Sequence, residues 1–347
     1  MNDLFKLEKP LSEEVVKSHW VYTDKVYISC VCTTFQQCGY IRDTINGFLG
    51  QETKYRFEII IHDDCSNDGT KKIIEEYKNA YPTLIKLVIQ TENQYSKGKR
   101  IWPIALSYAE GVFIALCEGD DFWIDKYKIQ YEAEVLINRG EVSLIHTKCY
   151  DYNVSNRTCE VSHVPKVMNN IESLLLSNNI HTLTTMFRRS YFIKFTEVFS
   201  ENINTWGFGD LPLWIYLSTL GEIVLLDRNT AVYRVLTESA SHSRSEEKMQ
   251  LFAKHGMDIR VHMAKKYYNK LQKSKALNEL ANRHIYTAIM YDYKVESFLI
   301  KHARFDNRIL ILLFQFRYTK LLSKRLLKFK LKIYNFLKRY FLLFKAS

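Results

Sequence analysis

The sequence has little proline, glycine and cysteine, and these shortages exclude several classes of protein. It contains 5 prolines and 12 glycines among 347 residues, too few for a collagen-like repeat or a disordered low-complexity chain. Its seven cysteines are scattered, odd in number and without a C-x-x-C pair. We therefore expect neither a disulfide framework nor a structural zinc site, and we infer a reducing compartment.

Long apolar runs are also absent. The longest uninterrupted run covers only residues 309–314, whereas a membrane-spanning helix needs about 20 residues. The first ten residues lack the apolar centre of a secretory signal peptide. We therefore expect a cytoplasmic protein without transmembrane helices.

The excess positive charge is confined to one end of the chain. The net charge is +11, and residues 301–347 alone hold 13 basic residues and one acid, a net of +12. Residues 1–300 hold 36 basic and 37 acidic residues, a net of −1. The charge pattern therefore does not indicate a polyanion-binding surface on the main body.

Strand and helix patterns alternate through the first 125 residues. Short apolar runs predict four strands, and apolar residues at helical spacing predict helices between them. This alternation indicates an α/β fold, with a mainly parallel sheet and helices on both faces. The predicted strands are residues 27–32, 57–61, 84–89 and 112–117, and the predicted helices are residues 40–48, a helix capped by Asp68, and residues 100–109.

The pattern is looser beyond residue 125, and no internal repeat is present. Helical spacing predicts four more helices, two apolar runs predict strands, and the polar residues 152–170 predict irregular structure. The helices are residues 126–136, 171–176, 191–199 and 211–220, and the strands are residues 142–146 and 222–226.

Polar side chains follow three of the predicted strands. In an open parallel sheet, ligands bind just beyond the carboxyl ends of the strands. We therefore expect these three segments to meet at one crevice. They are Thr33, Thr34, Phe35 and Gln36 after the first strand, residues 62–70 after the second, and residues 118–121 after the fourth.

Two acids separated by one glycine, Glu118-Gly119-Asp120, follow the fourth strand. Glycine lets the backbone approach a ligand closely, and a divalent cation such as Mg²⁺ or Mn²⁺ relieves the repulsion between neighbouring carboxylates. An isolated turn of this composition is more often only a local hydrogen-bonding structure. A second acidic cluster at the neighbouring strand end favours the metal site.

Three other aspartates each allow two interpretations. Asp63 and Asp64 follow a strand directly, where one carboxylate can bind a base or a ribose and another can cap the next helix. We favour ligand contact for Asp64 and a structural role for Asp63. Asp210 precedes an apolar helix, so helix capping and a functional role are equally consistent with the sequence.

These segments together resemble the family 2 glycosyltransferases, which are inverting enzymes with the GT-A fold. The resemblance extends over residues 26–245, and EIIIHDDCSNDGT is its most specific part. The matching segments are residues 26–50, 58–70 (EIIIHDDCSNDGT), 112–123 (VFIALCEGDDFW) and 205–220, together with Val232-Tyr233-Arg234.

The resemblance implies a site for a nucleotide-sugar donor and a hydroxyl acceptor. Asp120 would meet a Mg²⁺ or Mn²⁺ ion, and Asp210 would be the general base that removes the acceptor proton. A single displacement then inverts the anomeric configuration. The implied acceptor is a glycan or lipid-linked glycan, as in bacterial surface-polysaccharide assembly. The donor-binding residues implied are Thr33, Thr34, Phe35, Asp64, Ser66, Arg100, Glu118, Gly119 and Asp121.

Two positions depart from the family pattern. Glu118 stands where relatives place the first aspartate of their D-x-D motif, and Leu236 stands where many place a histidine. His242 could replace that histidine, although a lone histidine in a polar loop is usually only solvated. With these departures, the sequence is also compatible with a second function. In this alternative the protein is non-catalytic and binds a nucleotide sugar or a partner through a degenerate site.

The basic end of the chain has helical periodicity from Arg317 to Lys345, with basic residues on one arc and apolar residues opposite. This pattern favours peripheral contact with an anionic membrane surface, at the inner face of the cytoplasmic membrane. A helix packed on the body is the alternative, and nucleic acid is a weaker third interpretation.

The expected organisation is residues 1–25 as a lead-in, 26–125 as the donor half, 126–245 as the acceptor half, 246–300 as a helical extension and 301–347 as the basic tail.

Overall fold

A computed structural model describes residues 6–163, 170–237, 245–291, 295–315 and 325–326. The chain divides into two compact units, Met1–Met249 and Gln250–Ser347. The predicted tail helix from Arg317 onward lies almost entirely outside the described residues. His242 also lies outside them.

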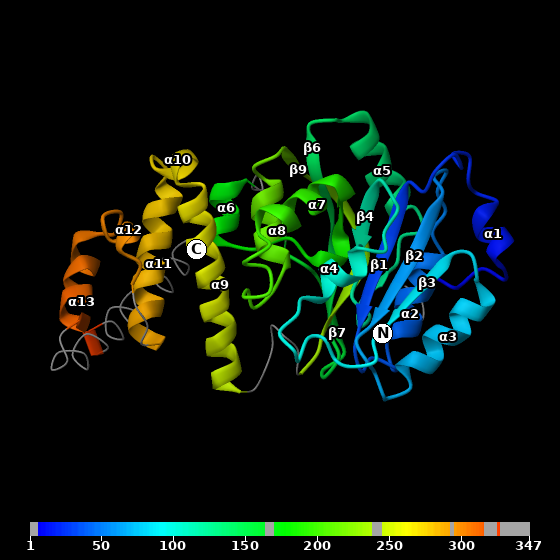
Figure 1. Cartoon of the computed structure of the whole chain (residues 1–347), viewed down its shortest axis with the longest axis horizontal. Helices are drawn as coiled ribbons and strands as arrows, with labels where there is room; N and C mark the ends of the chain where they lie inside the picture. Colours follow the sequence, from blue (N-terminus) through cyan, green and yellow to red (C-terminus); the bar gives the residue numbers. More distant parts are fainter. Residues whose placement is uncertain (1–5, 164–169, 238–244, 292–294, 316–324, 327–347) are drawn as a thin grey trace, which may run out of the picture. The chain divides into compact units, whose positions relative to one another are not determined.

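The first unit is built around one sheet with the strand order β3-β2-β1-β4-β8-β6-β9-β5. Its first half is parallel, as predicted, because each connection between these strands passes through a helix. Figure 1 shows α2 and α3 beside this half of the sheet. The elements are α1 (Glu13–Lys17), β1 (Ile28–Thr34), α2 (Ile41–Leu49), β2 (Phe57–Asp63), α3 (Thr70–Ala80), β3 (Ile85–Ile89), α4 (Ile101–Leu106) and β4 (Phe113–Leu116).

The second half of the sheet is mixed. Strand β8 is antiparallel to both β4 and β6, β5 is antiparallel to β9, and β6 and β9 are parallel. The remaining elements of this unit are β5 (Phe122–Trp123), α5 (Lys128–Asn138), β6 (Val142–Asn153), β7 (Thr158–Val161), α6 (Ile171–Leu176), β8 (Thr185–Arg188), α7 (Arg189–Val198), α8 (Asp210–Leu217) and β9 (Glu222–Val235), with a short 3₁₀ helix at Thr182–Thr184.

The structure corrects the sequence analysis in the β6–β7 region. Strand β6 continues to Asn153, and β7 forms a hairpin with it inside the stretch predicted to be irregular. The turn is closed by asparagine side chains, since Asn153 accepts the Ser155 N–H at 3.0 Å and Asn156 accepts the Thr158 N–H at 3.1 Å. All four β7 residues are exposed, so no apolar alternation marks this strand in the sequence.

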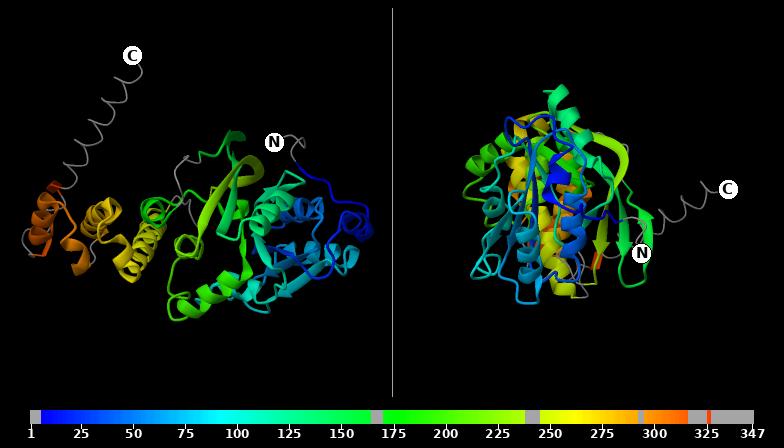
Figure 2. Two further views of the ribbon diagram at one scale, coloured as in Figure 1. Left: turned by 90° about the horizontal axis from the view of Figure 1, so that it is seen from above. Right: turned by 90° about the vertical axis from the view of Figure 1, so that its right-hand side faces the viewer.

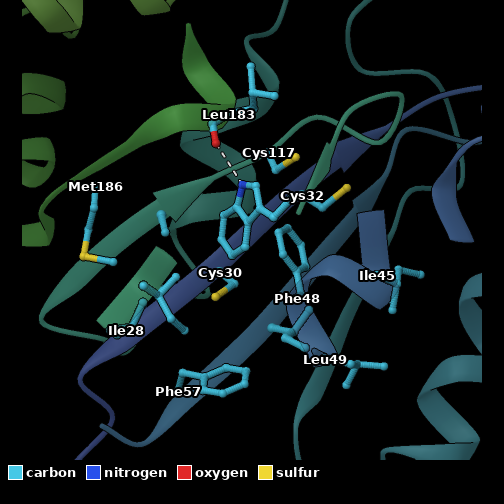
Figure 3. Close-up of a cluster of buried hydrophobic side chains, with 14 of the residues drawn as sticks. Ile28, Cys30, Cys32, Ile45, Phe48, Leu49, Phe57, Cys117, Leu183 and Met186 are labelled. Atoms are coloured by element: carbon cyan, nitrogen blue, oxygen red, sulfur yellow. Dashed lines mark hydrogen bonds between the residues drawn. The ribbon is translucent and has the colours of Figure 1, made fainter. Parts of the chain in front are cut away.

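The core of the first unit lies between the sheet and the helices that cover it. Strands β1 and β2 are almost wholly buried, which explains their continuous apolar runs. The Trp123 indole packs on Phe48 with ring centroids 4.5 Å apart, and its Nε1 donates to the Leu183 carbonyl at 2.8 Å. Figure 3 shows this cluster, in which Cys30, Cys32 and Cys117 are buried core residues.

The second unit contains helices only, within its described part (Figure 2, yellow to red). Apolar residues of α11, including Leu277, Leu280 and Ile285, are buried. Among the described residues, no helix is long and apolar enough to cross a membrane. The helices are α9 (Glu246–Lys266), which begins just before the division, α10 (Tyr268–Leu271), α11 (Lys275–Tyr291), α12 (Ser297–Ile300) and α13 (Phe305–Gln315).

Candidate active site

The carboxyl ends of β1, β2 and β4 meet at one edge of the sheet. The Asp64 N–H donates to the Thr34 carbonyl at 3.0 Å, and the Gly119 N–H donates to the Thr33 carbonyl at 3.0 Å. The end of β1 is therefore flanked by the loop after β2 and the turn after β4. The three polar segments predicted to converge are adjacent.

The turn at residues 118–121 is packed tightly against β1 and α2. A Cβ atom on Gly119 would lie 2.5 Å from the Gln37 Oε1 and 2.7 Å from the Thr34 Oγ1. The Thr44 hydroxyl donates to the Gly119 carbonyl at 3.1 Å and to the Asp121 carbonyl at 2.5 Å. Only glycine fits at this position, because the polar side chains around it leave no room for a methyl group.

Arg234 on β9 holds the other side of this turn. Its Nη1 donates to the Asp120 carbonyl at 2.6 Å, and its backbone N–H donates to the Asp121 carboxylate at 2.7 Å. Its Nη2 pairs with Asp43 of α2, and the guanidinium lies 4.3 Å from the centroid of the Phe122 ring. The sequence analysis placed Arg234 in a family segment without giving it a role, whereas the structure shows that it positions the acidic turn.

The acidic turn is strongly coupled electrostatically. Burial and the neighbouring Asp120 raise the pKa of Glu118 to about 8, with a further contribution from Asp210, while the Thr182 hydroxyl opposes the shift. Burial raises the pKa of Asp120, and burial with the two neighbouring acids raises the pKa of Asp121 well above its usual range. Carboxylates that raise one another's pKa in this way have the composition and crowding that suit a divalent cation.

Asp210 is the first residue of α8 and faces the same region as Glu118. Its Oδ2 accepts a hydrogen bond from the Asn178 Nδ2 at 2.8 Å. The N-cap of this helix is Gly209, so Asp210 is not the capping residue. Asn178 and Thr182 lie in the segment between α6 and β8, which the sequence analysis could not assign. No motif marks either residue.

Asp63, the last residue of β2, and Asp64, which follows it, both accept hydrogen bonds from backbone N–H groups. Both carboxylate oxygens of Asp64 accept backbone N–H groups, from Gln94 at 2.8 Å and Tyr95 at 3.0 Å. Asp63 accepts the Ser66 N–H at 3.0 Å. The structural role expected for Asp63 agrees with this contact. Asp64 also has a structural role, so its contact with a donor remains a prediction.

Polar contacts fix the loops around the end of β1. The Gln36 N–H donates to the Ser66 hydroxyl at 2.9 Å, and Thr34 donates to the Gln37 side chain at 2.8 Å. The Phe35 ring is 46% exposed and so is available to stack on a planar ligand. The Asp68 carboxylate accepts the Thr70 N–H at 3.0 Å, but the N-cap of α3 is Gly69, so Asp68 lies one residue before the capping position expected for it.

Arg100, directly before α4, is linked to the loop that precedes α8. Its Nη1 donates to the Gly207 carbonyl at 3.0 Å, and its backbone N–H donates to the Asn204 side chain at 3.0 Å. Its Nε is buried without a hydrogen-bond partner. An unsatisfied buried donor of this kind is available for an anionic ligand.

Comparison with known proteins identifies this domain. Residues 29–196 match the family model described as glycosyl transferase family 2. This part of the chain belongs to that family. The match includes β1, β2, β4 and the acidic turn, so the family 2 domain contains the carboxylates that converge at the sheet edge.

The chain is also similar to individual proteins, one of them a named glycosyltransferase. An uncharacterized protein of Mycobacterium tuberculosis is 29% identical over 239 residues, which cover 66% of this chain and 64% of that protein. The Escherichia coli UDP-Glc:α-D-GlcNAc-diphosphoundecaprenol β-1,3-glucosyltransferase WfgD is 24% identical, over 71% of this chain and 91% of its own length. The chain thus spans somewhat less than two thirds of the mycobacterial protein.

A solved structure gives the same fold. TarS from Staphylococcus aureus, a poly(ribitol-phosphate) β-N-acetylglucosaminyltransferase, is 26% identical over 74% of this chain and 44% of its own length. The structure of TarS residues 1–349 with UDP-GlcNAc superposes with a TM-score of 0.55, covering 88% of this chain and 92% of that one at 17% identity. The expected GT-A fold is confirmed.

Proposed function

We propose that this protein is an inverting glycosyltransferase that moves a sugar from a nucleotide-sugar donor to a hydroxyl group of a glycan or lipid-linked glycan. The observation that carries this proposal is the convergence of Glu118 and Asp120, at the end of β4, with Asp210, at the start of α8. The charges of Asp120 and Asp210 both contribute to the raised pKa of Glu118.

Asp210 has the surroundings of a general base. It is only half-buried, so an acceptor hydroxyl can reach it, and Asn178 holds one of its oxygens. The other oxygen would accept the proton as the hydroxyl attacks the anomeric carbon opposite the diphosphate. General base catalysis of this type typically contributes about 10²–10⁴-fold.

Asp120 would hold the metal ion, and Glu118 lies beside it. When bound, Mg²⁺ or Mn²⁺ would offset the negative charge of the leaving diphosphate. The role of the chain is to keep the carboxylates in place, through Arg234 on one side and Thr44 on the other. Asp121 is buried behind the turn with its carboxylate on the Arg234 N–H, which favours orientation of the turn over direct contact with the sugar.

The donor would bind across the ends of β1 and β2. Phe35 offers an exposed ring for the base, and Arg100 offers an unsatisfied Nε toward an anionic group. Thr33, Ser66 and Asp64 are the further residues that we propose contact the donor. The TarS structure contains UDP-GlcNAc, and the name of WfgD includes UDP-Glc, so UDP-sugars are the donors to test first.

Membrane contact at the cytoplasmic face is the second part of the proposal. In α13, Phe305 is 77% exposed and Ile309 is also exposed, next to the basic residues Lys301 and Arg304. Apolar and basic side chains together favour an anionic lipid surface. Co-sedimentation with vesicles containing anionic lipid, and not with neutral vesicles, is the expected result. Binding to RNA but not to vesicles would contradict it.

The decisive experiment measures donor binding and transfer separately. Thermal unfolding is followed with UDP, UDP-Glc and UDP-GlcNAc, each with Mn²⁺ or with a chelator. A ligand at 100 times its Kd should add about 2.7 kcal/mol to the free energy of unfolding. A metal-dependent shift that disappears in Asp120→Ala supports the donor site.

Transfer is then tested with a lipid-linked glycan acceptor. A protein that binds a donor but neither transfers nor hydrolyses it would be the non-catalytic alternative. Absence of any donor-dependent shift, in protein shown to be folded, would overturn the transferase proposal.

A further inference from the structure

A cysteine, an aspartate and a histidine meet beside β6, in a group that does not include the carboxylates of the acidic turn. Cys149 and Asp151 lie two residues apart on β6 and therefore point to the same face. His181 comes from the segment before β8. One possible ligand atom from each of the three side chains lies within 4.8 Å of the other two.

The three side chains are held in place by their neighbours. Cys149 is fully buried, and Asp151 and His181 are half-buried. The His181 ring packs on Tyr233 with centroids 5.3 Å apart, and its Nε2 lies 2.8 Å from the Ser162 hydroxyl. The imidazole is therefore oriented before any ligand binds, as metal-binding histidines usually are.

One acceptor in this group has no partner. The Asp151 Oδ1 is buried and makes no hydrogen bond within the described part of the chain. An unsatisfied buried carboxylate oxygen is costly, and a cation between the three side chains would satisfy it. This orphaned atom is the second observation that points to a ligand.

We propose that Cys149, Asp151 and His181 form a binding site for Zn²⁺. Thiolate, imidazole and carboxylate together are a ligand set for zinc, whereas Mg²⁺ takes oxygen ligands. Binding converts the Cys149 thiol to a thiolate, and its proton leaves to the solvent. A water molecule would complete a four-coordinate shell.

The sequence analysis expected no structural zinc, because the ligands have no C-x-x-C spacing. The pattern is instead Cys-x-Asp on a strand, with a histidine 30 residues later, and only the fold brings them together. The site also lies on the segment that carries Asn178 and Thr182. Zinc would hold this segment beside the proposed base Asp210, a consequence that rests on the proposed function.

The test measures metal binding directly and does not depend on transfer. The full-length Asp120→Ala protein, which lacks the proposed donor metal ligand, is stripped with a chelator. It is then titrated with Co²⁺ and, in competition with a chromogenic chelator, with Zn²⁺. We expect one equivalent of Zn²⁺, and a near-ultraviolet thiolate-to-Co²⁺ absorption band that Zn²⁺ abolishes.

Matched variants identify the residues that bind the metal ion. Cys149→Ser should remove the Co²⁺ band, and His181→Ala should weaken Zn²⁺ binding at least about 10-fold. Cys159→Ser, which changes an exposed cysteine on β7, should leave both unchanged. If Cys149→Ser does not fold, Asp151→Asn at a half-buried position is used instead, and its Zn²⁺ affinity should fall at least about 10-fold. A folded protein without the band, or a band that survives in Cys149→Ser, would overturn the proposal.

Discussion

The Arg234 Nη1 lies 2.6 Å from the carbonyl oxygen of Asp120, although the two residues are 114 positions apart in the chain. This bond connects β9, the last strand of the sheet in sequence, to the acidic turn after β4. The same guanidinium pairs with Asp43 on α2. One side chain therefore joins three segments around the candidate metal site.

Replacing Arg234 should destabilise the protein and disturb the acidic turn. Arg234→Gln removes the partner of the Asp120 carbonyl and the buried partner of Asp43, which keeps only its ion pair with the more exposed Lys6 at 3.0 Å. We expect a loss of about 2 kcal/mol in the free energy of unfolding. Urea denaturation measures this loss. The control is Arg228→Gln on the same strand, where the ion pair with Asp125 is exposed at 3.5 Å. Its cost should stay under about 1 kcal/mol, and equal costs would contradict the role given to Arg234.

Adding one methyl group at Gly119 should be enough to damage the site. In Gly119→Ala the new Cβ would overlap with Gln37 and Thr34, and we expect about 1–3 kcal/mol of destabilisation together with weaker donor binding. Gly140→Ala is the matched control, because no atom lies within 4 Å of that Cβ position and its φ is outside the left-handed region. If Gly119→Ala leaves both the free energy of unfolding and the donor affinity unchanged, the turn accommodates the extra methyl group and the prediction is wrong.

Replacing the proposed base should separate binding from chemistry. Asp210→Asn keeps the shape of the side chain but cannot accept the acceptor proton, so transfer should fall by about 10²–10⁴-fold. Donor affinity, measured by calorimetry, should change little. Asp24→Asn, at an exposed aspartate, should retain full activity. Normal transfer by Asp210→Asn would assign the base elsewhere.

Asn178 should act through Asp210. Asn178→Ala removes the 2.8 Å hydrogen bond to the carboxylate, and we expect kcat to fall about 10-fold with little change in the KM for the donor. Steady-state kinetics with varied donor measure this. Asn179→Ala, at the next residue, removes a hydrogen bond from the Ser177 hydroxyl and serves as the control. A change in donor KM alone would place Asn178 in the donor site.

Metal-free protein should become less stable as the pH rises from about 5 to about 8. The pKa of Glu118 is raised from 4.5 to about 8, so in this range the folded protein holds a proton that the unfolded chain has lost. The folded state binds more protons, and the free energy of unfolding therefore decreases with pH. Asp120 and Asp121 shift in the same direction.

Urea denaturation at several pH values, with a chelator present, measures this slope. Glu118→Gln should flatten it, and Mn²⁺ added to the unmodified protein should flatten it as well. Glu222→Gln, at an exposed glutamate, should leave it unchanged. If the free energy of unfolding instead rose with pH, Glu118 would be ionised in the folded protein.

The sequence by itself determined the α/β class, the order of the first strands and helices, and the acids at the strand ends. Local patterns carry this information, since buried parallel strands appear as short apolar runs, and the loops after β2 and β4 are rich in Asp and Gly. The β6–β7 hairpin was not predicted, because the residues of β7 are all exposed and show no alternation of apolar and polar side chains.

Only the tertiary structure decided which of these residues are neighbours. Asn178 beside Asp210, Arg234 behind the acidic turn, and His181 beside Cys149 and Asp151 are each brought together by contacts between distant segments. No spacing in the chain encodes such pairs, because packing of the sheet against its loops sets their distances. The sequence therefore supplied the chemical groups, and the long-range packing decided which of them form a site.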